Sequence, residues 1–230
     1  IVDTTDKTST SGKLKAGMHT GVQTLTGLTG ADMDNYTFAD IKGDYKVNKL
    51  ALTGSIAQGL TTYGDALVAG TVTLSNKVGT DVVDASGVSI ATTGKTSTSG
   101  KLKAGEHTGI QTLSGLTGTD KDNYTFADVK GDYKVNKLAL TGSIAQGESI
   151  YGSALQAGAV TLSNKVGTDV VDASGVIVDT TDKTSTSGKL KAGEHTGIQT
   201  LTGLTGADMD NYTFADVKGD YKVNKLALTG

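Results

Sequence analysis

The segment from Leu102 to Phe126 reads LKAGEHTGIQTLSGLTGTDKDNYTF and occurs, with few changes, three times in the chain. The tetrapeptide Ser-Gly-Lys-Leu that leads into it begins at Ser11, Ser99 and Ser187, so each copy starts 88 residues after the one before it. A period this regular indicates one structural unit repeated in tandem.

The apolar pattern predicts where one unit ends and the next begins. The odd-numbered Tyr133 and Val135 are followed by the even-numbered Leu138 and Leu140, so the buried face of the chain changes between the two pairs. We therefore expect the C-terminal part of a module at 1–48, complete modules at 49–136 and 137–224, and the first strand of a following module at 225–230. Because no flexible linker separates these modules, neighbours should contact each other directly and form a stiff array.

The composition indicates a folded chain. The 230 residues include 32 glycines and no proline, cysteine or tryptophan, and 5% of them are aromatic. Disordered chains lack regularly placed aromatic and β-branched residues, whereas each copy here carries Tyr, Phe, Val, Ile and Leu at the same points. Without cysteine the chain has no disulfide framework and lacks the ligands of most zinc sites.

The charge argues against nucleic-acid binding. The net charge is −3, and none of the 21 basic residues is arginine, the side chain that favours bidentate contacts to bases and phosphates. The sequence has no run of 18 apolar residues, so we expect no membrane span.

Short alternating segments predict an all-β fold. Strands are expected at Leu50–Ile56, Thr71–Ser75 and Val82–Ile90, the last with a bulge at Ser86-Gly87. About seven such strands per unit favour a tandem array of immunoglobulin-like β-sandwich modules with the 88-residue period. A β-solenoid is the alternative, since its coils also carry Gly, Asn and Thr, although solenoid coils repeat at roughly 20 to 50 residues.

Four segments of the unit are expected to lie outside strands. Tyr63-Gly64-Asp65 and Asn76–Asp81 carry residues typical of turns, and Gly115–Gly118 is expected to form a glycine-rich turn. The polar segment Thr93–Gly100 contains no large apolar residue and is predicted to be an exposed loop.

The repeated motifs resemble the YDG and MBG repeats of large bacterial filamentous-haemagglutinin-like adhesins and biofilm-matrix proteins, which are exported by two-partner secretion. The matching segments are Tyr63-Gly64-Asp65, Ala104–Thr108, Leu113-Ser114-Gly115, Asp122–Phe126 and Tyr133-Lys134-Val135. Tyr-Gly-Asp stands where one of the two families has Tyr-Asp-Gly. The resemblance implies an extracellular location at the bacterial cell surface and a stalk or biofilm-matrix role.

An acidic turn ahead of each Asn-Tyr-Thr is the candidate metal site. Calcium binds six to eight oxygen atoms, commonly from an Asp-x-Asp/Asn-x-Asp/Asn-Gly loop. Here a tyrosine occupies the fifth place, so the turn offers an incomplete set of ligands, and a simple hairpin turn is the competing interpretation. The candidate calcium ligands are Asp32, Asp34, Asp120, Asp122, Asp208 and Asp210. No other cofactor is expected.

One histidine per copy, at His19, His107 and His195, stands between glycine and threonine. Catalysis would require a nucleophile or carboxylate within reach, and the unit contains no such constellation. We therefore expect the histidine to be a strand residue and the protein not to be an enzyme.

Together these predictions describe structural stalk or spacer repeats of a secreted adhesin or matrix filament that mediates cell–cell or surface attachment. The expected partners are the neighbouring modules of the same chain, with lateral self-association into fibres and a glycan or protein bound at a tip outside this chain as further hypotheses. The alternative function is an array of multivalent glycan- or protein-binding modules that gains avidity from repetition.

Overall fold

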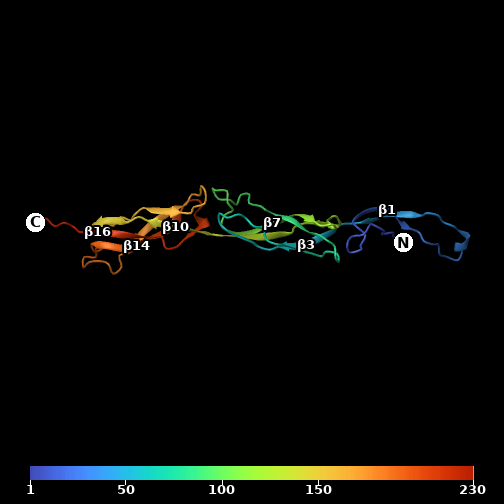
Figure 1. Cartoon of the computed structure of the whole chain (residues 1–230), viewed down its shortest axis with the longest axis horizontal. Coiled ribbons are helices and arrows are strands. Elements are labelled where there is room, and N and C mark those ends of the chain that lie inside the picture. The colour runs from blue at the N-terminus through green and yellow to red at the C-terminus, as the bar shows by residue number, and fades with distance from the viewer. Residues whose placement is uncertain (230) are drawn as a thin grey trace. The chain divides into compact units, whose positions relative to one another are not determined.

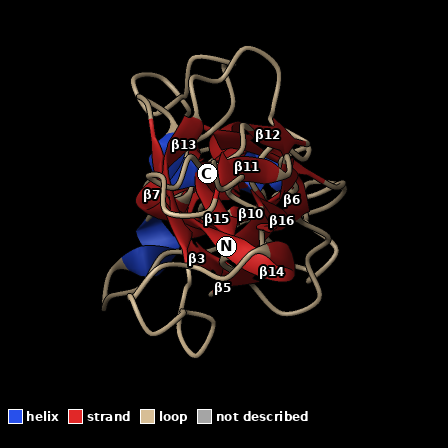
Figure 2. Cartoon of the chain, turned by 90° about the vertical axis from the view of Figure 1, so that its left-hand side faces the viewer, coloured by secondary structure: helices blue, strands red, loops and turns tan. Residues whose placement is uncertain are grey.

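The computed structural model describes residues 1–229, and within them strands, turns and loops make up nearly the whole chain (Figures 1 and 2). The predicted all-β class is confirmed. The strands are β1 (Gly17–Thr24), β2 (Lys42–Val47), β3 (Leu50–Ile56), β4 (Gly59–Thr62), β5 (Val72–Ser75), β6 (Asp84–Ile90), β7 (Gly105–Thr117), β8 (Tyr124–Phe126), β9 (Lys130–Asn136), β10 (Leu138–Ile144), β11 (Gly147–Ile150), β12 (Val160–Ser163), β13 (Asp172–Val178), β14 (Gly193–Thr205), β15 (Tyr212–Phe214) and β16 (Lys218–Asn224). Three single-turn 3-10 helices are η1 (Met33–Asn35), η2 (Lys121–Asn123) and η3 (Met209–Asn211).

The chain forms two compact units, and each is assembled from separate segments. Unit 1 comprises Ile1–Gly59, Ala69–Ala91 and His107–Tyr133, and unit 2 comprises Leu60–Val68, Thr92–Glu106 and Lys134–Gly230. Since the division passes through strands, the module boundaries expected after residues 48, 136 and 224 stay predictions.

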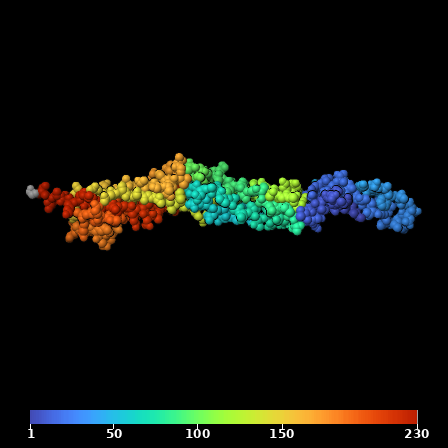
Figure 3. Space-filling model, in the orientation of Figure 1, coloured from blue at the N-terminus to red at the C-terminus, as the bar shows by residue number. Residues whose placement is uncertain are grey.

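Unit 2 contains two sheets. The three-stranded sheet has the order β12-β10-β15, and the four-stranded sheet has the order β11-β16-β14-β13. Most neighbours are antiparallel, but β10 runs parallel to β15 and β11 runs parallel to β16. The yellow, orange and red segments of this unit pack against one another (Figure 3). The arrangement is therefore sandwich-like.

Buried aliphatic side chains from both sheets form the core of unit 2. Ile144 of β10, Leu201 of β14 and Val217 are at most 6% exposed and contact one another. Burying each such side chain contributes about 1.5–3 kcal/mol relative to leaving it in water. Gln199, which is fully buried, satisfies its amide with the backbone: it accepts from Gly158 N at 2.7 Å and donates to two carbonyl oxygens.

Unit 1 repeats this arrangement at lower sequence numbers. Its three-stranded sheet has the order β5-β3-β8, and these strands begin 88 residues before β12, β10 and β15 respectively. A core of Ile56, Leu113 and Val129 corresponds to the core of unit 2. The strands predicted at Leu50–Ile56 and Thr71–Ser75 are present as β3 and β5.

The β6–β7 pair both confirms and corrects the predictions. Its register shifts on either side of Gly87, so the predicted bulge at Ser86-Gly87 is confirmed. The glycine-rich turn predicted at Gly115–Gly118 is wrong, because β7 continues to Thr117. Gly115 and Leu116 pair with β6, and these cross-strand hydrogen bonds keep the backbone extended despite the glycine.

The predicted change of buried face is visible at the end of β9. Tyr133 and Val135 are buried there, and after Lys137 the buried residues are Leu140 and Ile144. The strand expected at 225–230 is not formed over Lys225–Thr229, and Gly230 lies outside the described residues. The equivalent residues of β10 are held by β12 and β15, and no described strand pairs with Lys225–Thr229 in this way.

Candidate functional site

The strongest candidate site in each unit is a contact between a short loop and segments that follow it by 67 to 110 residues. The first joint, in unit 1, joins residues 9–16 to Asp81, Asp120 and Asn123. The second joint, in unit 2, joins residues 97–104 to Asp169, Asp208 and Asn211, together with Tyr63. Each joint links segments of two consecutive sequence copies.

The loop of the second joint is a tight hairpin. Ser97 N donates to Lys101 O at 2.8 Å, and Gly100 N donates to Ser97 O at 2.9 Å. These bonds leave the backbone N–H groups of Thr98 and Ser99 for partners outside the loop. Since buried backbone donors must be satisfied, the loop requires acceptors from elsewhere.

Two aspartates supply those acceptors. Thr98 N donates to Asp208 Oδ1 at 3.2 Å, and Ser99 N donates to Asp169 Oδ1 at 3.1 Å. The second oxygen of Asp208 accepts from Val170 N at 3.0 Å. Burial opposes ionisation of Asp208, but the hydrogen bonds from Val170 N and from the backbone and side chain of Thr98 outweigh it and lower its pKa. Hydrogen bonds to a charged acceptor are roughly twice as strong as neutral ones.

Two further hydrogen bonds complete the polar part of the second joint. Ser99 Oγ donates to Val166 O at 2.6 Å, and Ala104 N donates to Asn211 Oδ1 at 2.8 Å. Asn211 is buried at the end of η3. The loop is thus held along its length rather than at one point.

Tyr63 adds an aromatic contact to the second joint. Its side chain is 1% exposed, and its ring meets the Tyr212 ring edge to face with centroids 5.3 Å apart. Such pairs contribute about 0.5–1.5 kcal/mol beyond the area they bury. The Tyr63 hydroxyl donates to Asp169 and lies 2.6 Å from Ser97 Oγ. Tyr212 donates to the same Asp169 oxygen at 2.7 Å.

These contacts shift the pKa of all three titratable groups. Burial raises the pKa of Tyr63, and the hydrogen bond to ionised Asp169 raises it further. The same two causes raise the pKa of Tyr212 to about 12. For Asp169 burial opposes ionisation, but the donors Ser99, Tyr63 and Tyr212 outweigh it and lower the pKa. Asp169 is therefore the charged centre of the joint.

Gly64 allows Tyr63 to reach this position. Its φ of +95° lies in the region that favours glycine, and a Cβ there would lie 2.8 Å from Val166 Cγ2. Glycine therefore follows Tyr63 for a steric reason in this copy.

The first joint repeats the polar contacts of the second. Thr10 N donates to Asp120 Oδ1 at 3.2 Å, and Ser11 N donates to Asp81 Oδ1 at 3.0 Å. Burial opposes ionisation of Asp81, but hydrogen bonds from its neighbours outweigh it and lower its pKa to about 2. The charged form is therefore the stable one in the joint.

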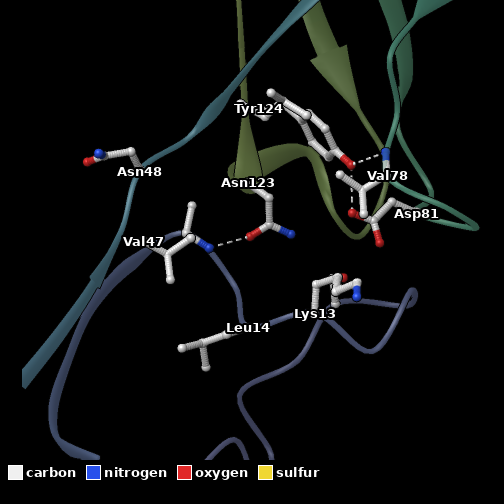
Figure 4. Close-up of a pocket in the computed structure, with 11 residues that line it drawn as sticks. Lys13, Leu14, Val47, Asn48, Val78, Asp81, Asn123 and Tyr124 are labelled. Carbon is white, nitrogen blue, oxygen red and sulfur yellow. Dashed lines mark hydrogen bonds between the residues drawn. The ribbon is translucent and has the colours of Figure 1, made fainter. Parts of the chain in front are cut away.

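Figure 4 shows the acceptor side of the first joint. The Tyr124 hydroxyl donates to Asp81 Oδ2 at 2.7 Å and accepts from Val78 N at 2.9 Å. Asn123 Oδ1 accepts from Ala16 N at 2.8 Å. Tyr124 therefore orients Asp81 in the way that Tyr212 orients its aspartate in the second joint.

The two joints differ at the position of Tyr63. The first joint has a cavity of about 150 Å³ whose walls include Ser9, Asp81 and Tyr124 (Figure 4). The residues at the same positions of the second joint are the three that contact Tyr63. The cavity therefore corresponds to the place that a tyrosine occupies in unit 2.

The predicted calcium ligands separate into two groups. Asp120 and Asp208 are buried acceptors in the joints, and each binds two backbone N–H groups. The others are exposed: Asp32, Asp34, Asp122 and Asp210. Over residues 1–229, no group of three or more His, Asp or Glu residues is placed to hold a metal ion. Calcium binding at these turns stays a hypothesis.

The sequence prediction did not identify Asp81, Asp169 or Tyr63 as site residues. Asp81 and Asp169 stand in the identical segments Lys77–Gly87 and Lys165–Gly175, where an acidic residue precedes two valines. That repeated pattern was a usable signal, but it does not reveal the partner. The predicted exposure of Thr93–Gly100 is wrong for Ser97, which is 7% exposed because the loop docks in the joint.

The histidines lie in strands, as predicted: His19 in β1, His107 in β7 and His195 in β14. His19 Nε2 lies 2.8 Å from the carbonyl oxygen of Lys15, and His195 Nε2 lies 2.8 Å from that of Lys191. These hydrogen bonds tie the ring to the chain segment just before the strand.

Comparison with protein-family models, curated proteins and solved structures found no match for this chain. No helix within residues 1–229 has the length and apolar character needed to cross a membrane.

Proposed function

We propose that the chain is a tandem array of immunoglobulin-like β-sandwich modules with an 88-residue period, acting as a stalk or spacer in a secreted bacterial adhesin or extracellular matrix filament. The observation that carries this proposal is the repetition of the joint. Four hydrogen bonds recur at corresponding positions, and corresponding distances agree within 0.1 Å. Contacts that recur in this way suit a chain whose function depends on the geometry of its repeats.

The strand order supports a sandwich over a solenoid. The repeats at 49–136 and 137–224 each contribute a sheet of three strands and a sheet of four, and in unit 2 these share the core around Ile144 and Leu201. Seven strands in two sheets is the arrangement of an immunoglobulin-like domain. A solenoid would instead stack short coils with a period of roughly 20 to 50 residues.

The proposed mechanism is additive. Each repeat would contribute its own core and one joint, so that every added repeat extends the array by the same step. The joint contains buried, hydrogen-bonded carboxylates. Breaking one of these hydrogen bonds would leave a buried polar group without a partner, so the segments that meet in the joint have little freedom to change their relative orientation. The extracellular, attachment-mediating role rests on the resemblance to YDG and MBG repeats.

Small-angle scattering tests the spacer role. The full chain is compared with a chain lengthened by a second copy of residues 137–224, and then by a third. We expect the maximum dimension to grow by a constant increment. A matched pair of lengthened chains, with and without Asp169→Ala in each copy, should differ, because the variant loosens the joint. A maximum dimension that does not grow with added repeats would contradict the proposal.

A further inference from the structure

Tyr63 and Tyr212 meet in the second joint at the ends of their rings that carry the hydroxyl groups. Both hydroxyls donate to the same atom, Oδ2 of Asp169. The ring centroids are 5.3 Å apart, and the ring planes are inclined at 77° to each other. Because the hydroxyls converge on one oxygen atom, the carbons ortho to the hydroxyls lie at the end where the two rings approach each other.

This geometry is close to that of a dityrosine, in which one carbon–carbon bond joins the ortho carbons of two tyrosine rings. The centroids of rings joined in this way are only slightly closer than those of Tyr63 and Tyr212. The joined rings can also be strongly twisted about the new bond, so the steep angle between the ring planes is no obstacle. The pair therefore needs only a small movement to form the bond.

The composition of the chain directs one-electron oxidation to tyrosine. The chain has eight tyrosines and neither tryptophan nor cysteine. Tryptophan and cysteine are the side chains that most often compete with tyrosine for the loss of a single electron. In their absence an electron is removed most easily from a phenol ring.

Asp169 supplies the base that such an oxidation requires. A phenol that loses an electron becomes a strong acid, so the electron leaves more easily when a neighbouring base accepts the hydroxyl proton. Burial opposes ionisation of Asp169, but hydrogen bonds from Ser99 and from both tyrosines outweigh it and lower its pKa. Both phenols therefore already donate to a carboxylate that is charged at neutral pH.

The surroundings hold the two rings in place and keep other reactants away. Tyr63 is 1% exposed and Tyr212 is 3% exposed. Tyr63 N donates to Asn136 O at 2.8 Å, and the Tyr212 hydroxyl accepts from Val166 N at 2.9 Å. A radical on either ring thus has the other ring in contact, while a second protein molecule cannot reach it. Coupling within the joint is therefore favoured over coupling between molecules.

We propose that Tyr63 and Tyr212 form an oxidative modification site at which a dityrosine bond closes the second joint. The co-reactant is a one-electron oxidant, of the class that haem peroxidases generate from hydrogen peroxide, and two equivalents of it are reduced. Each ring gives one electron to the oxidant, and Asp169 accepts each hydroxyl proton in turn and passes it to solvent. The two phenoxyl radicals then join through their ortho carbons. The hydrogen on each joined carbon moves to the oxygen of its own ring, which restores both hydroxyls, so the net loss is two electrons and two protons.

The new bond makes the joint covalent. Tyr63 lies in the segment 49–136 and Tyr212 in the segment 137–224, so the bond links two consecutive sequence copies. A cross-link between residues so far apart in the chain restricts the unfolded state, and in theory links that close long loops stabilise most. We therefore expect the oxidised chain to unfold at a higher urea concentration than the unmodified chain. This site does not rest on the stalk role proposed above.

The test uses the full chain at low concentration with a ruthenium tris-bipyridyl complex, persulfate and a brief flash of light, which together generate a one-electron oxidant. We expect a monomeric product that shows dityrosine fluorescence and has lost two hydrogen atoms by intact mass. Protease digestion should release a cross-linked species that contains the peptides of Tyr63 and Tyr212. A monomer fraction without this species, or dityrosine confined to products that contain two chains, would overturn the inference.

Two conservative variants test the assignment of the rings. Tyr63→Phe and Tyr212→Phe keep an aromatic ring but cannot form a phenoxyl radical, so each should lose the cross-link. Tyr36→Phe, at a tyrosine that is 68% exposed, is the matched control and should keep it. Hydrogen exchange of the Thr98 and Ser99 amides verifies that the joint is closed in every variant. An undiminished monomeric cross-link in either joint variant would refute the assignment.

A third variant, Asp169→Asn, tests the carboxylate as the base. The amide can still accept hydrogen bonds but cannot take up the phenol proton, so cross-linking should be slower than in the unmodified chain. Cross-linking at an unchanged rate would overturn the role assigned to Asp169. All of these readouts concern the covalent structure of the chain, so this proposal and the stalk role fail separately.

Discussion

The two joints share one set of polar contacts and differ in one aromatic residue. In both, a short loop donates backbone N–H groups to two aspartates and an asparagine. Each joint has one tyrosine that donates to its central aspartate, Tyr124 or Tyr212, and among the described residues the second joint alone has another, Tyr63. Since the polar distances agree within 0.1 Å with and without that ring, the hydrogen-bonded part and the aromatic part of the joint are separable.

The largest effect is expected from Tyr63→Ala, which would make the second joint resemble the first. Loss of the buried ring and its edge-to-face contact should lower the free energy of unfolding of unit 2 by about 3–5 kcal/mol. Urea unfolding, with hydrogen exchange of residues 92–106 as a local probe, measures it. The matched control is Tyr151→Ala, at the same position in the next copy, where the hydroxyl lies within hydrogen-bond distance of Ser185 and Ser187 and of no aspartate among the described residues. An equal loss in both variants would contradict the assigned role.

Removing the central aspartate should cost more in the second joint than in the first. Asp169 accepts from Tyr63, Tyr212 and Ser99 N, whereas Asp81 accepts from Tyr124 and Ser11 N. Each buried donor left without a partner costs about 1–3 kcal/mol, so Asp169→Ala should lower stability by about 3 kcal/mol and Asp81→Ala by less.

The measurement is urea unfolding of both variants, followed by separate probes in units 1 and 2. Asp210→Ala, at an exposed position, serves as the control and should change stability by less than about 0.5 kcal/mol. The comparison fails if Asp81→Ala proves the more destabilising of the two.

The asparagine contact should be worth the same in both joints. Asn123 and Asn211 each accept one backbone N–H at 2.8 Å, so each Asn→Ala variant should cost about 1–2 kcal/mol. Asn35, the exposed residue at the same position of the first copy, is the matched control and should tolerate Ala. Hydrogen exchange of Ala16 and Ala104 amides reports the loss directly. Unequal losses of stability would show that the two joints differ in energy although their hydrogen-bond distances agree.

Acid should weaken both joints at a lower pH than ordinary carboxylates titrate. The folded-state pKa of Asp81 is lowered from 3.8 to about 2, and those of Asp169, Asp120 and Asp208 are also lowered. A carboxylate whose pKa is lower in the folded state than in the unfolded state contributes stability that is present above about pH 4 and is lost as the pH falls toward 2. NMR titration of the Ser11 amide should follow this loss, and Asp81→Asn should remove it. A Ser11 transition centred near pH 4 would contradict the assignment.

The smallest effect is expected from calcium. Both carboxylate oxygens of Asp120 and Asp208 already accept backbone N–H groups, so a metal ion would have to displace these donors. We therefore expect calcium or a chelator to shift the melting temperature by less than about 1 °C, well under the roughly 4–8 °C that 1 kcal/mol produces in a small domain. A larger shift that Asp32→Asn or Asp34→Asn abolished would instead support a calcium site at the exposed turns.

The comparison of copies also shows where prediction from sequence succeeds. The strands at Leu50–Ile56 and Val72–Ser75 and the bulge near Gly87 follow from alternation and from local turn chemistry. The predicted turn at Gly115–Gly118 failed because pairing with β6 outweighs the local preference of glycine. Local patterns are reliable where no distant strand competes with them.

The candidate site was predictable only in part. The acidic turns drew attention to Asp120 and Asp208, but as metal ligands rather than as acceptors for a loop about 110 residues earlier in the chain. Asp81 and Tyr63 were assigned to turns. Thr98 and Ser99 were assigned to an exposed loop, because a small polar segment has the same composition whether its N–H groups face water or a carboxylate.

Residue spacing and alternation alone predict that the chain is repetitive, is built from strands and changes its buried face near Asn136. These properties depend on spacing and alternation, which act between residues that are close in the chain. The three-dimensional fold was needed to show which aspartates become buried acceptors and why Tyr63 is followed by glycine. Those properties depend on hydrogen bonds and steric contacts between segments 67 to 110 residues apart, whose partners no local pattern specifies.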